Sequence, residues 1–360
     1  MKLYAQSVNG LLTPAQVGNT LMHEHILCDL RDPASRDNKE NCPPITMENR
    51  FQTDYFQNRN PSNMVLDDKD VATNELALFK QAGGGTIVEL SVGGLAPQPE
   101  QLKAISATTD VNIIIGAGYY VDAYMPDEAR SADIDALETL LLAQLRQGIW
   151  GTDICAGIIG EIGCSWPLKD SEKRLLIAAA RVQARTGVAI TIHPGRNHDA
   201  PKQIGEILIK AGGDPSRTII GHMDRTIFDR DRLISLLNSG FLLEWDFFGI
   251  ETSQYWMSGE DLDLPTDYMR LDLIHALIAK GYRNQITISQ DICTKTRLAT
   301  YGGHGYVHLL ANIVPMMARR GWSQKDIQLL FTGTPARLLC YLSNDQNTSR
   351  TTTQITQGKQ

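Results

Sequence analysis

Two histidines one residue apart, His23 and His25, lie in the otherwise apolar segment LMHEHIL near the start of the sequence. Successive side chains of a β-strand point to opposite faces, so a strand here would direct both imidazoles to the same side. Neutral imidazole is a common zinc ligand, and a His-x-His pair can hold one metal ion from a single strand. Two hydrogen-bonded structural histidines would give the same pattern, so the interpretation depends on the acidic and imidazole groups downstream.

Segments rich in Ile, Val and Leu alternate with segments of helical periodicity along most of the 360 residues. After the strand at His23, extended runs are predicted at 86–92, 111–118, 156–163, 188–193, 217–222, 241–247 and 285–291. Helices are predicted at 70–82, 99–108, 132–147, 171–186, 202–211, 230–238, 268–280, about 304–320 and 324–341. Apolar strands separated by helices are typical of a parallel sheet covered on both faces. Eight such units favour an α/β fold of the (β/α)8 TIM barrel type over an open doubly wound sheet.

The pattern predicts a single barrel domain over residues 1–342, with a loop insertion at about 31–66 that is rich in Asn, Pro and charge. The polar residues 343–360 are predicted to be a disordered tail. The sequence has no Gly-x-Gly-x-x-Gly motif after a strand and no phosphate-binding Gly-x-x-x-x-Gly-Lys motif. Nucleotide binding therefore loses support.

Composition narrows the range of partners. The net charge of −7, the pI near 5.6 and the lack of a Lys/Arg run argue against nucleic acid. No apolar run approaches the roughly 18 residues of a spanning helix, and the first residues lack the apolar core of a signal peptide. Six cysteines without a Cys-x-x-Cys spacing are predicted to be free thiols. We therefore expect a cytoplasmic protein that does not bind membranes. The sequence is compatible with a homodimer.

Catalytic residues of a TIM barrel lie at the carboxyl ends of its strands. Four histidines and two carboxylates fall near those ends: His23, His25, Glu161, His193, His222 and Asp291. This is the composition of a two-metal site, in which one ion would take His23, His25 and Asp291. The second ion would take His193 and His222. Glu161 could bridge the two ions because a carboxylate has two oxygens to share.

Such a centre has a defined chemistry. Two divalent ions about 3.5–4 Å apart can hold a hydroxide between them and polarise a substrate oxygen. Imidazole and carboxylate ligands without cysteine suit Zn, and also Mn, Co or Fe. We expect two divalent metal ions as cofactors, with Zn as the first candidate. A barrel that has lost catalysis and only binds a ligand is disfavoured, because the ligand set is complete.

The pattern of His23-x-His25 with His193, His222 and Asp291 resembles that of the amidohydrolase superfamily. The surrounding sequences LMHEH, GEIG, IHPGR, GHMDRT and SQDIC are similar to those of the phosphotriesterase family, and most of all to its phosphotriesterase-related branch. The resemblance covers residues 5–342 or so. It implies a binuclear metal-dependent hydrolase on a (β/α)8 fold, with Asp291 as the catalytic acid and base.

Glu161 departs from the best-known members of that family, which bridge their metals with a carboxylated lysine. Glutamate is typical of the phosphotriesterase-related branch, which is associated with hydrolysis of N-acetyltaurine and similar N-acyl amino acids. The resemblance thus implies a hydrolase of linear amides that uses a metal-bridging hydroxide. A lactonase, or a phosphotriester or phosphoester hydrolase, on the same metal centre is the alternative.

A small, anionic N-acyl substrate requires a cationic contact. Arg196 and Arg225 each follow a predicted ligand histidine by three residues, and the planar guanidinium group suits oxyanions. Tyr119 and the adjacent Tyr120 follow the third strand and could contact the scissile carbonyl group. The alternative is that the tyrosines only pack against their loop and that the arginines pair with neighbouring acids: Asp199, Asp224 or Asp229.

Overall fold

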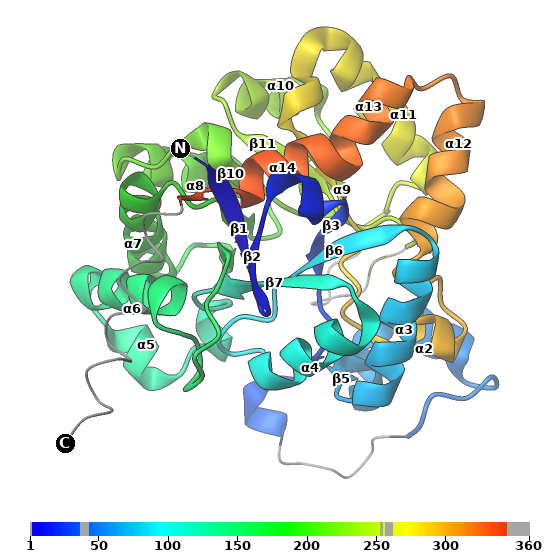
Figure 1. Ribbon diagram of the computed structural model, residues 1–360, viewed down its shortest axis with the longest axis horizontal. Helices are drawn as coiled ribbons and strands as arrows, with labels where there is room; N and C mark the ends of the chain where they lie inside the picture. Colours follow the sequence, from blue (N-terminus) through cyan, green and yellow to red (C-terminus); the bar gives the residue numbers. More distant parts are fainter. Residues whose placement is uncertain (1, 37–42, 253–254, 256–261, 344–360) are drawn as a thin grey trace.

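The computed structural model describes residues 2–36, 43–252, 255 and 262–343. Eight parallel strands follow one another in chain order around a nearly closed barrel (Figure 1). They are β3 (Asn19–Glu24), β6 (Gly84–Glu89), β7 (Asn112–Ala117), β8 (Ile158–Gly163), β9 (Ile190–His193), β10 (Thr218–Ile220), β11 (Leu242–Trp245) and β12 (Ile286–Ile288). The TIM barrel predicted from the alternating segments is confirmed.

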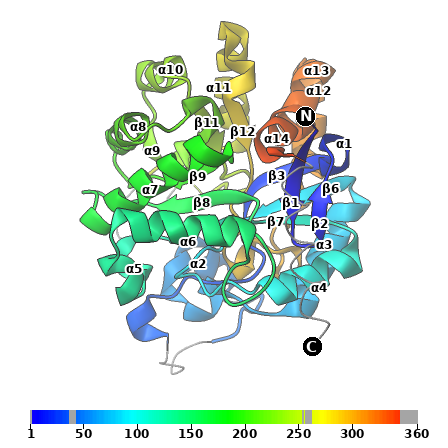
Figure 2. The same ribbon diagram turned by 60° about the vertical axis from the view of Figure 1, so that its left-hand side comes forward.

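Helices surround the strands on the outside (Figure 2). The main ones are α3 (Lys69–Gln81), α4 (Pro99–Thr109), α6 (Ile134–Arg146), α7 (Asp170–Thr186), α8 (Ala200–Lys210), α10 (Arg230–Asn238), α11 (Asp267–Leu277), α12 (Val314–Arg319), α13 (Gln324–Gln328) and α14 (Thr334–Leu339). Short helices are α1 (Pro14–Val17), α2 (Arg50–Tyr55), α5 (Asp127–Ser131) and α9 (Met223–Thr226). In α6, for example, the buried residues Leu137, Leu141 and Leu145 are spaced by four and share one face, whose burial stabilises the helix.

Two predicted helices differ from the structure. The helix expected from about residue 304 begins only at Leu309, because Gly302 and Gly305 adopt positive φ angles of 79° and 62° in the preceding loop. The helix expected over 324–341 is divided by a wider turn at Leu329–Gly333. The α14 segment then ends at Leu339, and Cys340 is extended.

A small antiparallel sheet covers one end of the barrel. It consists of β1 (Leu3–Ser7), β2 (Gly10–Leu12) and β13 (Leu342–Ser343), with β1 in the middle. The N–H of Val8 donates to the carbonyl of Ile113, near the start of β7, at 2.9 Å. Side chains of this sheet and of α14 join a buried cluster with inward residues of the strands: Ala5, Leu12, Met22, Val88, Ile114, Ile158, Ile219, Leu242, Leu338 and Leu339. This end of the barrel is therefore filled by side chains, and a functional site can form only at the opposite end.

The segment at 31–66 contains short helices and a strand in its described part. α2 is followed by β5 (Val65–Leu66), which pairs with β4 (Cys28–Asp29) just after the first barrel strand. Arg50 of α2 donates to the carbonyls of Tyr301 and Thr296, at 2.9 and 3.0 Å, and so joins the segment to the loop after β12. The tail predicted to be disordered lies outside the described residues from 344 onward.

The five described cysteines are buried and form no disulfide; Cys42 is outside the described residues. Within the described part of the chain, no helix combines the length and the apolar character that crossing a bilayer requires.

Candidate active site

All six predicted ligand residues meet at the carboxyl end of the barrel. Glu161, in β8, lies at their centre. Its Oε2 is 3.0 Å from Nδ1 of His193, 3.3 Å from Nε2 of His23 and 3.5 Å from Nε2 of His222. Its Oε1 is 3.4 Å from Nε2 of His25. Burial alone would raise the pKa of Glu161, but the surrounding imidazoles hold that pKa well below the usual carboxyl range.

Asp291 approaches the same group from the other side. Its Oδ1 is 3.3 Å from Nε2 of His25 and 3.8 Å from Nε2 of His23, and its Oδ2 is 3.9 Å from Nδ1 of His222. Burial acts to raise the pKa of Asp291, but the hydrogen bond with His25 and the nearby His23 and His222 lower it overall. Asp291 is therefore held ionised at the edge of the cluster.

His222 and Asp291 correct one expectation about the strands. The extended runs were predicted to reach both residues, but β10 ends at Ile220 and β12 ends at Ile288. His222 and Asp291 instead adopt left-handed backbone conformations, with φ angles of 56° and 47°. These conformations are uncommon for residues other than glycine, so the surroundings must hold them. The turn at each position brings a side chain inward after its strand has ended.

Each histidine nitrogen that faces away from the cluster has a partner. Nδ1 of His222 donates to Oδ1 of Asp246 at 2.9 Å, and Oδ2 of Asp246 accepts the N–H of His222 at 2.9 Å. Nδ1 of His25 lies 3.0 Å from Oγ of Ser91, and Nδ1 of His23 lies 3.3 Å from Oε2 of Glu244. Such partners orient imidazole ligands and set their tautomers.

Sequence reasoning missed the acids that hold these histidines. Glu244 and Asp246 stand two residues apart in the apolar run FLLEWDFF, and both are completely buried. Buried charges are costly unless they are paired. Two acids in a buried strand were therefore a signal that could have identified them.

The donor set fits two divalent cations. Nε2 of His23 is buried and has no hydrogen-bond partner among the described residues, although Glu161 is nearby. His23, His25 and Asp291 can place one donor atom each within 4.8 Å of one another, and so can His23, Glu161 and His222. Nδ1 of His193 lies 2.8 Å from Nε2 of His222, so this nitrogen also faces the cluster. A cation would satisfy the orphan nitrogen and the closely spaced carboxylates together.

Two arginines border the cluster, and both were proposed from the sequence to contact the substrate. Arg225 is 3% exposed, and its Nη2 lies 3.1 Å from Nε2 of His193 and donates to the carbonyl of Pro194 at 3.1 Å. Burial lowers the pKa of Arg225, and the positive charge of Arg196 adds to this effect. The guanidinium of Arg196 lies 5.7 Å from the centre of the Tyr255 ring.

The acids that were alternative partners of these arginines have other partners. Asp224 pairs with the buried Arg270, and its Oδ2 accepts the N–H of Asp246 at 2.9 Å. Asp199 pairs with Arg232, and Asp229 caps the first turn of α10.

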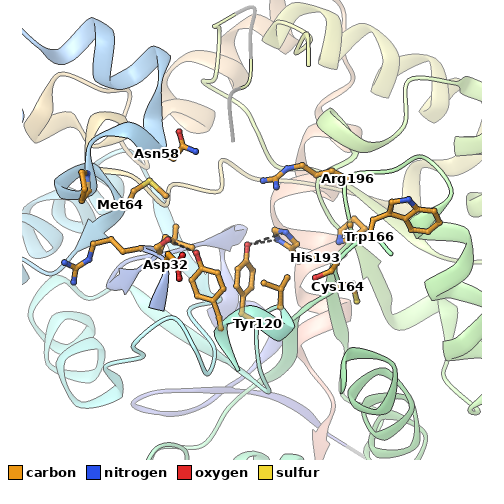
Figure 3. Close-up of a pocket in the computed structure, with 16 residues that line it drawn as sticks. Asp32, Asn58, Met64, Tyr120, Cys164, Trp166, His193 and Arg196 are labelled. Carbon is orange, nitrogen blue, oxygen red and sulfur yellow. Dashed lines mark hydrogen bonds between the residues drawn. The ribbon is translucent and has the colours of Figure 1, made fainter. Parts of the chain in front are cut away.

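Two adjoining cavities lead to the cluster. An inner cavity of about 30 Å³ touches all of the predicted ligand residues except His23, together with Arg196, Arg225 and Tyr120. An outer cavity of about 580 Å³ shares Tyr120, His193 and Arg196 with it. Figure 3 shows Tyr120 pointing to His193 while Arg196 reaches over the same space, and the Tyr120 hydroxyl lies 3.3 Å from Nε2 of His193.

The structure does not bring Tyr119 into this group. Its ring packs edge-on against Trp150, with ring centres 5.6 Å apart, and Tyr119 lines neither cavity. Adjacent residues at a strand end point in opposite directions. Of the two tyrosines proposed from the sequence, Tyr120 lines the site and Tyr119 does not.

A TIM barrel with histidines and carboxylates gathered at the carboxyl ends of its strands defines a class of metal-dependent hydrolases. The sequence profile of the phosphotriesterase family matches residues 3–339, and the chain belongs to that family. The family uses a binuclear centre of divalent metal, and the clusters around His23 supply donors of the required type.

Similar proteins agree with this assignment. The chain is 42% identical to an N-acetyltaurine hydrolase of Xenopus tropicalis over 341 residues, which cover 93% of this chain and 97% of that protein. It is 42% identical to a phosphotriesterase-related protein of Nematostella vectensis, with coverage of 94% and 98%. A resiniferatoxin-binding protein from Rhodobacter sphaeroides has a similar crystal structure, with 30% identity, a TM-score of 0.87 and coverage of 93% and 94%.

Proposed function

We propose that this hydrolase cleaves small N-acyl amines that carry an anionic group, with N-acetyltaurine as the first candidate substrate. The observation that carries this proposal is the position of Arg225, whose buried guanidinium contacts the ligand histidine His193. A buried cation beside the reacting centre suits a sulfonate or carboxylate, because charge-assisted hydrogen bonds are strong where water is excluded. The relatives named N-acetyltaurine hydrolase support the same substrate.

We propose that His23, His25 and Asp291 hold one divalent ion and that His193 and His222 hold the other, with Glu161 between them. Zn is the first candidate, and Mn, Co or Fe fit the same donors. Two bound divalent ions would lower the pKa of a water molecule and polarise the acyl oxygen. The uncoordinated nitrogens of His222 and His25 remain hydrogen-bonded to Asp246 and Ser91, which orients both rings.

Asp291 carries the proton in this proposal. Its ionised carboxylate accepts a proton from the attacking water and delivers it to the departing nitrogen. An amine leaves poorly unless it is protonated, so this step matters more for an amide than for an ester or a lactone. Positioned proton transfer of this kind contributes about 10²–10⁴-fold.

Arg225 and Arg196 bind the anionic end of the substrate in this arrangement, and Tyr120 forms a wall beside His193. Two adjacent guanidinium groups suit an oxyanion better than a neutral triester, whose pocket would be aromatic and apolar. The two guanidinium groups at the inner cavity are thus the reason to prefer an amide with an anionic group over a phosphotriester.

The test is a hydrolysis panel with the purified protein in the presence of added Zn²⁺ or Mn²⁺. It contains N-acetyltaurine, several N-acetyl amino acids, a neutral N-acetyl alkylamine, a lactone and an aryl phosphotriester. We expect the anionic amides to give the highest kcat/KM. Faster turnover of the lactone or the triester would instead identify the alternative function. We also propose a cytoplasmic location, since burial of Cys28, Cys164, Cys293 and Cys340 without a disulfide suits a reducing compartment.

A further inference from the structure

The main chain around Asp291 is held from two sides by two buried side chains of opposite charge, Glu24 and Arg297. Oε1 of Glu24 accepts the N–H of Gln290, and Oε2 of Glu24 accepts the N–H of Ile292, both at 2.9 Å. On the opposite side, the guanidinium of Arg297 donates to the carbonyls of Gln290 and Asp291. Glu24 is 0% exposed and Arg297 is 3% exposed, so water competes with neither contact.

The strand that carries the His-x-His pair satisfies the remaining groups of the same three residues. The N–H of Asp291 donates to the carbonyl of His23 at 3.0 Å, and the N–H of His25 donates to the carbonyl of Ile292 at 3.2 Å. Every N–H and C=O of residues 290–292 therefore has a protein partner. This complete pairing is what can hold Asp291 in its left-handed conformation.

These contacts lie at a seam of the barrel. The eight-stranded sheet begins with β3 and ends with β12, and the described residues form no strand ladder between these two. Glu24 is the last residue of β3, and Ser289 follows β12. Oγ of Ser289 donates to Oε1 of Glu24 at 2.7 Å and accepts the N–H of His23 at 2.9 Å. Hydrogen bonds of the Ser289 side chain therefore help to join β3 to β12, whereas main-chain ladders join the other neighbouring strands of the barrel.

The predicted ligands of one metal ion stand on both sides of this seam, with His23 and His25 on one side and Asp291 on the other. We propose that Glu24, together with Arg297, is a positioning residue that fixes the separation of the His23–His25 pair from Asp291. This inference rests on the metal centre of the proposed function. Glu24 lines neither cavity of the site, and both of its oxygens already accept hydrogen bonds. It acts through Asp291 and is not itself a ligand.

The test compares two buried glutamates that perform the same local task. In Glu24→Gln an amide group replaces one carboxylate oxygen, so one N–H of the 290–292 segment loses its acceptor. Glu75→Gln is the matched control. Glu75 is 1% exposed and accepts the N–H groups of Ala299 and Thr300 at 3.0 and 2.7 Å, in the same loop but away from the ligands.

The readouts are the binding of Zn²⁺ in competition with a chelating dye and the absorption spectrum of the Co²⁺-loaded protein. Loss of a group that orients a ligand typically costs 10–100-fold in metal affinity, and we expect about that loss for Glu24→Gln. The Co²⁺ spectrum should change as well. Glu75→Gln should lose comparable stability in urea but keep the wild-type affinity and spectrum.

The outcomes separate this inference from the proposed function. If the wild-type protein binds no Zn²⁺, Mn²⁺ or Co²⁺, the metal centre itself is wrong. If the wild type binds metal and Glu24→Gln binds it equally well with the same spectrum, only the positioning role is overturned, and equal losses in both variants overturn it too. Should Glu24→Gln fail to fold, Arg297→Lys, which keeps the charge but cannot reach both carbonyls, should show the loss of affinity. Failure of both variants to fold while Glu75→Gln folds would overturn the proposal in favour of a role in folding.

Discussion

Asp246 holds His222 by two hydrogen bonds, one to the ring and one to the main chain, and each is 2.9 Å long. The carboxylate thereby fixes both the orientation of the imidazole and the left-handed backbone that presents it.

The first prediction follows from the pairing of Asp246 with His222. Asp246→Asn should weaken the binding of the second metal ion by about 10–100-fold, because the ring loses a charged partner. Zn²⁺ titration measures this, and Asp326→Asn, a buried acid far from the site, should leave the affinity unchanged.

The second prediction concerns the carboxylate at the centre of the cluster. Purified protein should carry close to two transition-metal ions, and Glu161→Gln should lose both metal and activity because the shared charge is removed. His23→Ala should lower the metal content in the same way. Elemental analysis after dialysis gives the answer, and full occupancy in Glu161→Gln would contradict the bridging role. Glu161→Lys with added bicarbonate should recover part of the metal, since it imitates the carboxylated lysine of the best-known members of the family.

The third prediction separates the two tasks of Asp291. Asp291→Asn should reduce kcat far more for an amide than for an ester or lactone of similar size, because only the amine leaving group needs the proton. The expected difference is of order 10²–10⁴-fold, the usual contribution of positioned proton transfer. Metal content must be measured alongside the rates. Equal losses on both substrates, with the metals retained, would remove the role as an acid.

The fourth prediction concerns Arg225 and the charge of the substrate. Arg225→Met keeps much of the side-chain volume but removes the guanidinium, so the KM for N-acetyltaurine should rise. A charge-assisted hydrogen bond contributes about 1.5–3 kcal/mol, which corresponds to roughly 10–100-fold. A neutral N-acetyl alkylamine loses only the effect of the contact between Arg225 and His193, so its kcat/KM should fall much less. Arg232→Met, which removes an exposed arginine paired with Asp199, is the control and should change neither value.

The fifth prediction is about stability. Arg270 is 0% exposed and pairs with Asp224 and with Asp267, the latter at 2.7 Å. Arg270→Met leaves two buried carboxylates without this partner and should cost about 3–5 kcal/mol in free energy of unfolding at pH 7. Urea unfolding followed by circular dichroism measures the difference, and a loss below 1 kcal/mol would mean that the carboxylates find other partners.

The pH dependence of that loss follows from the pKa of Asp267. Burial acts to raise this pKa, but the hydrogen bond from His308 and the charge of Arg270 lower it overall. A carboxyl group with a lowered pKa stabilises the fold above its unfolded pKa, and this stabilisation is lost as the pH falls. The difference between wild type and Arg270→Met should therefore remain from pH 7 down to about pH 4, near the unfolded carboxyl pKa, and shrink as the pH falls below that value.

The strands and helices of the barrel were predictable because the signal for each is local. The spacing of apolar residues in α7, for example, reports the face that packs on the sheet, and Gly187 marks the end of the helix with a φ angle of 72°. The ligand positions were predictable for a related reason, since strand ends of a TIM barrel meet at one rim.

What escaped prediction depends on contacts between distant segments. His23 and Glu244 are 221 residues apart in the sequence, and nothing local to either residue indicates that they touch. The left-handed turns at His222 and Asp291 were missed because neither residue is a glycine, the residue type that usually indicates a positive φ angle. Deciding which of Tyr119 and Tyr120 faces the site required knowing where β7 ends, and strand boundaries are the least certain part of a sequence-based assignment.

The pairing of β1 with β13 has a consequence for how the molecule is made. Leu3 lies opposite Ser343 and Tyr4 opposite Leu342. The small sheet that covers one end of the barrel therefore joins the first and the last strands of the described chain. Domains form progressively as the chain emerges from the ribosome, amino-terminal parts first. β1 can pair with β13 only after residue 343 has left the ribosomal exit tunnel. Until then, β1 can pair only with β2. This sheet therefore depends on a contact between segments far apart in the sequence, which forms more slowly than local pairing because a long loop must close first.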